Sequence, residues 1–267
     1  MSASAPRRRL VLAAALSCCA AATITLSVRA EIPQAERRSA YEDMSRDNKA
    51  MQDDDTANPA MLLVLDGEAL WQTKAGRAGK SCADCHGDAQ EKMKGVAARY
   101  PAFDTASGRP VNLEQRVNIC REKQQNASPF AYESKELLAL TAYLGLQSRG
   151  EPIAPPDDPR LTPFRDKGRE FYNQRIGQLN LACVHCHDDN WGKSLAGAKV
   201  PQAHPTGYPI YRLEWQSVGS LQRRLRNCMI GMRAEPYAFG AAEHVDMELY
   251  LMWRARGMKV ETPAVRP

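Results

Sequence analysis

Two copies of one pentapeptide constrain this chain more than any other feature of its sequence. Residues 82–86 and 183–187 both read Cys-x-x-Cys-His. Two thiols three positions apart can add to the two vinyl groups of one porphyrin, and the adjacent His then lies under the iron. A redox dithiol is the alternative for one copy, and two copies in matching surroundings disfavour it. We therefore expect two covalently bound haem c groups, with attachment thiols Cys82, Cys85, Cys183 and Cys186 and proximal iron ligands His86 and His187.

The surroundings of the two motifs repeat as well. A shift of 101 residues places residues 67–71 on residues 168–172. Beyond the motifs, a shift of about 108 places residues 113–120 on residues 221–228. This pattern indicates an internal duplication with a seven-residue insertion in the second copy. Each copy predicts an amphipathic helix, the haem motif, a loop rich in Pro and Gly, a short helix ending near a Cys, and a last helix.

Helical periodicity and linker composition predict the fold class and its boundaries. Residues 134–147 and 242–254 have the apolar spacing of the last helix in each copy. Residues 155–159 are rich in Pro and Asp, which is typical of a linker. We expect an all-α fold of two tandem cytochrome c-like domains, residues 31–152 and residues 153–267.

The N-terminal 30 residues have the three parts of a secretory signal. Three consecutive arginines precede an apolar run that starts at Leu10, and Val28-Arg29-Ala30 is an acceptable cleavage site. We expect residues 1–30 to be a signal peptide that directs the protein to the periplasm. A retained N-terminal anchor is the alternative. No later segment is apolar enough to span a membrane, so we expect no membrane span in the mature protein.

Removing residues 1–30 also changes the net charge. The whole chain has 36 basic and 31 acidic residues and a net charge of +5. The first 30 residues contain four Arg and no acid, so the remainder has a net charge of +1. The basicity is therefore largely a feature of the export signal, and it gives no case for binding nucleic acid.

Two cysteines after residue 30 lie outside the motifs. Cys120 and Cys228 occupy equivalent places in the two copies. A thiolate is a strong axial donor that stabilises ferric iron. Met93, the only Met between His86 and residue 229, is too close to His86 in sequence to cover the ring. We expect Cys120 and Cys228 to be distal iron ligands, with a disulfide between them as the alternative.

The region around Cys228 carries further candidates. Arg224 lies one helical turn before Cys228 and shares its face, so its guanidinium is placed to hold an oxyanion. A solvated basic helix is the alternative interpretation, because the same segment carries Arg223, Arg226 and Arg233. The rivals to Cys228 as distal ligand of the second haem are Met229, Met232, His204 and His244.

At this point the sequence resembles the SoxA family, the larger cytochrome subunit of the SoxAX complex of thiosulfate oxidation. The resemblance is most specific in residues 221–236 and residues 248–253. It extends through most of residues 40–260. Single-haem members lack the first Cys-x-x-Cys-His, and its presence here indicates the two-haem form.

The resemblance implies roles for particular residues. Cys228 would be the distal ligand of the second haem and the catalytic residue, carried as a persulfide. Arg224 would bind the anionic substrate, and Cys120 would be the distal ligand of the first haem. The implied reaction joins thiosulfate oxidatively to a cysteine of the SoxYZ carrier protein. Two electrons would leave through a monohaem cytochrome of the SoxX type, which forms a heterodimer with this chain.

Two other functions remain open at the level of sequence. One is a dihaem electron-transfer protein with no substrate of its own, which a Met ligand at the second iron would favour. The other is a thiosulfate dehydrogenase, which would convert free thiosulfate to tetrathionate without a carrier protein.

Overall fold

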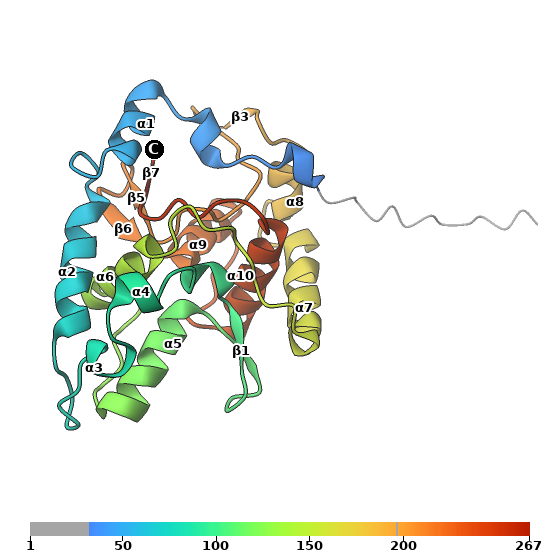
Figure 1. The fold of residues 1–267 in the computed structure, drawn as a ribbon. Coiled ribbons are helices and arrows are strands. Elements are labelled where there is room, and N and C mark those ends of the chain that lie inside the picture. Colours follow the sequence, from blue (N-terminus) through green and yellow to red (C-terminus); the bar gives the residue numbers. More distant parts are fainter. Residues whose placement is uncertain (1–31, 196) are drawn as a thin grey trace, which may run out of the picture. The chain divides into compact units, whose positions relative to one another are not determined.

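The helices of the two copies pair in the same way. In the computed structural model, which describes residues 32–195 and 197–267, α2 (Ala60–Gln72) packs against α6 (Lys135–Leu146) (Figure 1). In the second copy α7 (Thr162–Asn173) packs against α10 (Ala242–Arg254). The last helix predicted in each copy is therefore confirmed. The predicted signal peptide lies outside the described residues.

A glycine lies where each helix pair crosses. A Cβ on Gly67 of α2 would lie 2.1 Å from the carbonyl oxygen of Ala139 in α6. A Cβ on Gly168 of α7 would lie 2.1 Å from the carbonyl oxygen of Asp246 in α10. No side chain fits at such a distance, so only glycine permits this approach of the two backbones. The same contact recurs in both copies, which confirms the duplication.

Equivalent aromatic residues fill the core beside each crossing. The rings of Trp71 and Tyr143 lie 6.2 Å apart between centroids, and the rings of Tyr172 and Tyr250 lie 5.4 Å apart. All four side chains are buried. Tilted and edge-to-face contacts at these distances add to the free energy of burying the rings. Each copy thus has its own aromatic core, assembled from its first and last helix.

The segments between the paired helices also correspond. Each haem motif lies on a short helix, α3 (Ala83–His86) or α8 (Cys183–His187). An antiparallel hairpin and a further helix follow each motif. In the first copy these elements are β1 (Ala102–Asp104), β2 (Arg109–Val111) and α5 (Leu113–Cys120), and in the second β5 (Ile210–Arg212), β6 (Ser217–Gly219) and α9 (Leu221–Gly231).

The remaining elements are short and connect or cover this framework. The α-helices are α1 (Arg46–Asp53) and α4 (Ala89–Lys92), and the strands are β3 (Ser194–Leu195), β4 (Ala198–Lys199) and β7 (Ala264–Arg266). Single 3-10 turns are η1 (Gln34–Glu36), η2 (Ala40–Asp43), η3 (Ala97–Arg99) and η5 (Pro159–Leu161), and η4 (Arg121–Gln125) is a π-helical turn.

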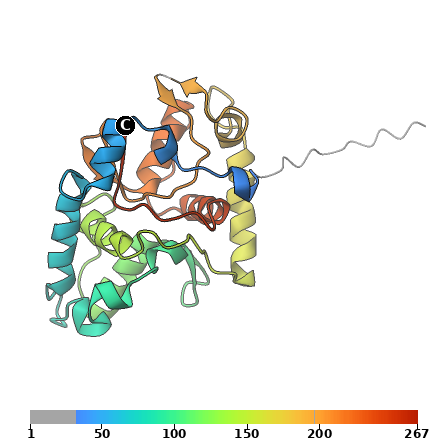
Figure 2. The same cartoon turned by 45° about the horizontal axis from the view of Figure 1, so that its top comes forward.

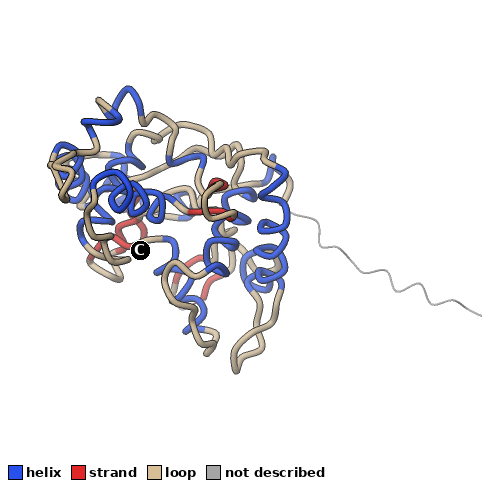
Figure 3. Tube along the Cα trace, turned by 90° about the horizontal axis from the view of Figure 1, so that it is seen from below, coloured by secondary structure: helices blue, strands red, loops and turns tan. Residues whose placement is uncertain are grey.

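The prediction of an all-α fold holds only in part. The fold is helix-rich and cytochrome c-like, but β7 pairs in parallel with β5, giving a three-stranded sheet of order β6-β5-β7. Figure 3 shows the strands as short segments among helices and loops. Strands of two or three residues are too short to leave an alternating apolar pattern, which is why the periodicity did not reveal them.

The first residues of the described chain pack against the second copy. The backbone N–H of Val265 in β7 donates to Oε1 of Gln52 in α1 at 3.1 Å. Nearby, the N–H of Arg38 donates to Oε1 of Gln202 at 2.8 Å. Figure 2 shows α1 beside the C-terminus. Both ends of the described chain therefore contribute to the second copy. None of the helices in residues 32–195 and 197–267 combines the length and the apolar character needed to cross a bilayer.

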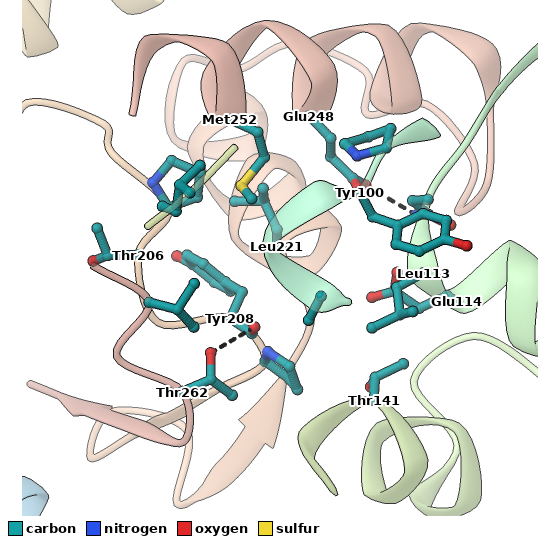
Figure 4. A pocket seen from close by; sticks show the side chains of 17 residues that line it. Tyr100, Leu113, Glu114, Thr141, Thr206, Tyr208, Leu221, Glu248, Met252 and Thr262 are labelled. Atoms are coloured by element: carbon teal, nitrogen blue, oxygen red, sulfur yellow. Dashed lines mark hydrogen bonds between the residues drawn. The ribbon is translucent and has the colours of Figure 1, made fainter. Parts of the chain in front are cut away.

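A small cavity of about 70 Å³ lies between the two copies. Figure 4 shows Glu248 of α10 entering it, with Glu114 and Thr141 from the first copy and Tyr208 from the second. Oε1 of Glu248 accepts hydrogen bonds from the side-chain amides of Asn112, at 3.2 Å, and Gln222, at 2.6 Å. Burial, together with the nearby carboxylate of Glu114, raises the pKa of Glu248 to about 8.

The raised pKa of Glu248 makes stability depend on pH. The folded-state pKa lies above the ordinary value of 4.5, so this residue contributes stability fully below pH 4.5 and loses the contribution as pH rises toward 8. We expect the free energy of unfolding to fall by about 3 kcal/mol between pH 5 and pH 8. Glu248→Gln should reduce this fall while its amide oxygen still accepts both hydrogen bonds, and the remaining pH dependence should come from Glu114, whose pKa burial raises to about 7. Urea unfolding at the two pH values measures the effect.

A surface variant provides the control for that experiment. Glu68 is exposed on α2, and Glu68→Gln should keep the wild-type dependence on pH. An unchanged pH dependence in Glu248→Gln would show that Glu248 does not couple protonation to folding.

Candidate functional site

The second haem motif holds its histidine in a defined tautomer. Nδ1 of His187 lies 2.6 Å from the carbonyl oxygen of Pro201. A carbonyl only accepts, so Nδ1 carries the proton and Nε2 keeps its lone pair. A hydrogen bond of this kind orients a metal-binding imidazole and fixes the nitrogen that binds. His187 is therefore prepared to bind a metal through Nε2.

A cavity of about 390 Å³ adjoins His187. Cys228, in the last third of α9, is part of its wall, and Leu225 and Leu251 supply part of its apolar surface. The N-terminal segment closes another side through Met44. A largely apolar cavity with a few polar groups is typical of a cofactor site.

His187 and Cys228 both line this cavity, and their side chains lie close to each other. Burial raises the pKa of the Cys228 thiol, but the neighbouring imidazole of His187 and the positive charges of Arg224 and Arg212 outweigh burial, so the net shift is downward. In the first copy burial dominates and raises the pKa of Cys120. The two equivalent thiols therefore differ in electrostatic surroundings.

A glycine in the loop before each haem motif lets the segment that follows Cys120 or Cys228 approach that loop closely. In the loop before the first motif a Cβ on Gly76 would lie 2.0 Å from the carbonyl oxygen of Gln125, shortly after Cys120. In the second copy a Cβ on Gly177 would lie 2.2 Å from the carbonyl oxygen of Met232, shortly after Cys228. Both glycines have φ near +65°, where other residues are strained.

All six described cysteines are free. Burial raises the pKa of Cys82, and the neighbouring Cys120 adds to this shift. Burial likewise raises the pKa values of Cys183 and Cys186, and the neighbouring Cys228 adds to both shifts. Each candidate distal thiol thus lies beside the motif of its own copy. The alternative of a disulfide between Cys120 and Cys228 is not formed in this structure.

The rivals to Cys228 are placed differently from one another. Met229 is buried and lines a separate pocket with Tyr237. His244 is buried against the same tyrosine, and its Nδ1 bonds the carbonyl oxygen of Ala238 at 3.1 Å. Of the rivals, only His204 is among the described residues that line the cavity with His187. Burial lowers the pKa of His204 to about 4, so it is neutral at physiological pH.

The first haem motif is more exposed than the second. The side chain of His86 is exposed, and its ring lies 5.7 Å from that of Trp71. The indole N–H of Trp71 donates to the carbonyl oxygen of Gly87 at 3.0 Å, which fixes the end of the motif helix. Cys120 is the last residue of α5 and is half-buried.

The arginines around Cys228 separate into different environments. Arg223 lies over the ring of Trp215 at 4.3 Å, and Arg226 lies over Phe239 at 4.6 Å. Of the four arginines considered in the sequence, Arg224 is the one that lines the cavity within the described residues. The interpretation as a solvated basic helix therefore applies to part of the cluster, and Arg224 is placed toward the thiol as expected.

Two residues of this cavity were not found by the sequence analysis. Arg212, at the end of β5, and Tyr208, just before it, line the cavity with Cys228 although they precede it by 16 and 20 residues. The helical pattern around Cys228 cannot reach them, because a hairpin brings them there. The duplication could have pointed to Arg212, since the shift of 108 residues aligns it with Asp104 and the charge at this position is reversed between the two copies.

These residues fit a covalently attached haem. The second copy combines two free thiols, an imidazole with Nε2 available and a thiol facing it, around an apolar cavity. Thiolate and imidazole are established donors to haem iron. The first copy has the same donor types at equivalent positions, in a more open setting.

Comparison with known proteins agrees with this reading of the fold. A family model described as SoxA/TsdA, cytochrome c domain, matches residues 66–153 and 167–260, which correspond to the two copies. The crystal structure of SoxXA from P. pantotrophus is similar with a TM-score of 0.83 and 30% identity, covering 86% of this chain and 87% of that chain.

Sequence relatives extend the comparison. A protein named L-cysteine S-thiosulfotransferase subunit SoxA from Pseudaminobacter salicylatoxidans is 42% identical over 215 residues, 80% of this chain and 75% of the relative. One of the same name from Rhodovulum sulfidophilum is 34% identical over 231 residues, 86% of this chain and 80% of the relative.

The fold and the motifs define a c-type cytochrome of two cytochrome c-like domains that holds haem c. The chain belongs to the SoxA family, whose similar members are named as enzyme subunits.

The assignment of the distal ligands leads to a spectroscopic prediction. In the haem-loaded protein we expect thiolate-type low-spin ferric signals by electron paramagnetic resonance. Cys228→Met should remove the signal of the second haem alone, and Cys120→Met that of the first alone, because each thiol lies beside its own motif. Each variant is the matched control of the other. A wild-type spectrum with a Met–iron charge-transfer band, or signals unchanged in both variants, would contradict the assignment.

Proposed function

We propose that this protein is a subunit of an L-cysteine S-thiosulfotransferase that joins thiosulfate to a cysteine of the SoxYZ carrier protein. The observation that carries the proposal is the cavity in which the thiol of Cys228 lies beside the guanidinium of Arg224. Family membership supports the choice of thiosulfate, since the relatives carry this activity in their names. The cofactors in this proposal are two haem c groups, one on each motif.

The overall step is an oxidation. The S–H bond of the carrier cysteine breaks and an S–S bond forms between its sulfur and the outer sulfur of thiosulfate. One proton and two electrons leave, and the product retains one negative charge of the sulfonate. Haem c, when bound, would accept these electrons one at a time. The electrons pass on to a monohaem partner of the SoxX type, a pairing supported by the similarity to SoxXA.

The residues of the chain divide the remaining tasks. Cys228, as a persulfide, would be the sulfur nucleophile, and Arg224, whose charge lowers the pKa of the Cys228 thiol, would favour an anionic sulfur there. Arg224 also binds the sulfonate oxygens by charge-assisted hydrogen bonds. The apolar wall of the cavity limits water, which strengthens both interactions.

The location of the protein belongs to the same proposal. Residues 1–30 would direct export to the periplasm, and the domain boundaries would follow the duplication, residues 31–152 and 153–267. Catalysis is assigned to the second domain, with Cys183, Cys186 and His187 holding its haem and Cys228 completing the iron coordination. In the first domain Cys82, Cys85, His86 and Cys120 would take the equivalent roles.

Loss of Arg224 should impair turnover much more than haem binding. We expect Arg224→Ala to lower the rate with thiosulfate and carrier by about 30- to 1,000-fold, because removing a charge-assisted contact in a partly dry site costs about 2–4 kcal/mol. Haem content should stay the same, since Arg224 is not a predicted ligand. Steady-state kinetics and the haem absorbance of the purified protein measure the two effects.

A neighbour on the same helix is the control for Arg224. Arg226 is engaged by Phe239 and by the carbonyl oxygen of Tyr237, away from the cavity. Arg226→Ala should therefore retain most activity. Equal losses in the two variants would mean that general basicity of α9, rather than a specific contact, supports the reaction.

The two cysteine variants decide which domain is catalytic. Cys228→Met keeps an iron ligand but removes the nucleophile, so transfer of thiosulfate to the carrier should stop. Cys120→Met should retain most activity, because the proposed substrate site lies in the second domain. Both are assayed with thiosulfate and carrier under the same conditions. An active Cys228→Met beside an inactive Cys120→Met would place catalysis in the first domain, and tetrathionate formation without carrier would indicate a thiosulfate dehydrogenase instead.

A further inference from the structure

The duplicated hairpin carries opposite charges at one equivalent position. In the first domain this position is Asp104, the last residue of β1. Its Oδ1 accepts a hydrogen bond from Nη2 of Arg116 at 2.8 Å, so the two charges neutralise each other. Arg116 is the counterpart of Arg224 on the following helix. The arginine beside the first haem motif is therefore paired with a carboxylate.

In the second domain the carboxylate is replaced by a cation. Arg212 is the last residue of β5, where the first domain has Asp104. Arg224 consequently has no carboxylate partner among the described residues. The two guanidinium groups of Arg212 and Arg224 line the same cavity as the thiol of Cys228.

Arg212 itself is only weakly neutralised. Its Nη2 lies 3.0 Å from Oε2 of Glu214, but the side chain of Glu214 is 59% exposed, so solvent screens this pair. The side chain of Arg212 is only 15% exposed, and its Nε is buried without a hydrogen-bond partner among the described residues. Burial and the charge of Arg224 both lower the pKa of Arg212.

The other charged side chains that line the cavity are exposed to solvent or paired. Lys199 is exposed. Arg266 is engaged by the carboxylate of Glu261 and the side chain of Gln52. Asp43 also lines the cavity, and its carboxylate pairs with Arg38 at 2.9 Å. The wall beside Cys228 thus retains two positive charges close together, which repel each other until an anion lies between them.

We propose that Arg212 and Arg224 form one site for a dianion, and that Arg212 selects doubly charged thiosulfate over singly charged analogues. This inference rests on the proposed function and names the residue that sets the charge specificity of that site. Two guanidinium groups present enough donors to hold the sulfonate oxygens from two sides. Their combined charge of two matches that of thiosulfate. The first domain lacks such a site because Asp104 takes the place of the second arginine.

The test compares two ligands that differ in charge. Thiosulfate is a dianion, whereas methanethiosulfonate carries the same outer sulfur and one negative charge. Binding of each to the haem-loaded protein, together with any cytochrome that co-purifies, is measured by calorimetry without carrier protein. We expect Arg212→Gln to weaken thiosulfate binding roughly 10- to 100-fold, the range for a lost charge-assisted hydrogen bond, and methanethiosulfonate binding less than about threefold. Unchanged thiosulfate binding, or equal loss for both ligands, would overturn the inference.

Matched variants separate charge from structure. Arg116→Gln removes the first domain's counterpart of Arg224, which lies outside the proposed site, and should leave thiosulfate binding unchanged. A loss equal to that of Arg212→Gln would show that overall charge, not a local site, attracts the anion. Arg212→Lys keeps the charge and should keep the preference for the dianion, and this variant decides the question if Arg212→Gln does not fold. Loss of the preference in Arg212→Lys would also contradict the proposal.

The same measurements separate this inference from the proposed function. Wild-type protein that binds no thiosulfate and transfers none to carrier would refute the proposed function. Wild-type protein that does both, beside an Arg212→Gln variant with the same charge preference, would refute only the role of Arg212.

Discussion

The close approach of backbones at four glycines is the constraint on which the rest of the structure depends. Gly67 and Gly168 let the first and last helix of each domain touch, and this contact assembles the aromatic cores. Gly76 and Gly177 then fix the loop before each haem motif against the segment that follows Cys120 or Cys228. A Cβ at any of these positions would push elements apart and change the separation of the two candidate iron ligands.

The two domains share these glycine contacts but differ in the residues that surround Cys120 and Cys228. The first leaves its histidine exposed and neutralises its arginine with Asp104. The second encloses His187 and Cys228 in a cavity and replaces that carboxylate with Arg212. The framework is held by backbone contacts at these glycines, and side-chain changes elsewhere leave those contacts intact. Charge and enclosure could therefore change in one domain while the positions of the cysteines and histidines stayed equivalent.

Some features of this protein could be predicted from its sequence, and others became visible only in the structure. The two motifs, the duplication and the last helices, residues 134–147 and 242–254, could be read directly, because local spacing and long periodic helices determine them. The position of Arg224 beside Cys228 could be predicted because residues four positions apart lie on the same face of a helix. Helical spacing could not identify Arg212, since the β5–β6 hairpin and its packing bring this residue to the thiol of Cys228. The strands could not be predicted, because an alternating apolar pattern cannot be recognised in two or three residues. The packing of α1 on the second domain could not be predicted either, because it depends on contacts between residues far apart in the chain.

That last contact has a consequence for how the protein is made. Gln52 and Val265 are separated by 213 positions, so α1 cannot dock until synthesis has reached the C-terminal strand. Contacts between such distant parts of a chain form late in folding, because the connecting segment must first be ordered. Met44 in this N-terminal segment forms part of the cavity wall at Cys228. Closure of the cavity wall at Met44 would therefore follow the formation of β7, and a haem group could reach Cys183 and Cys186 before that wall closes.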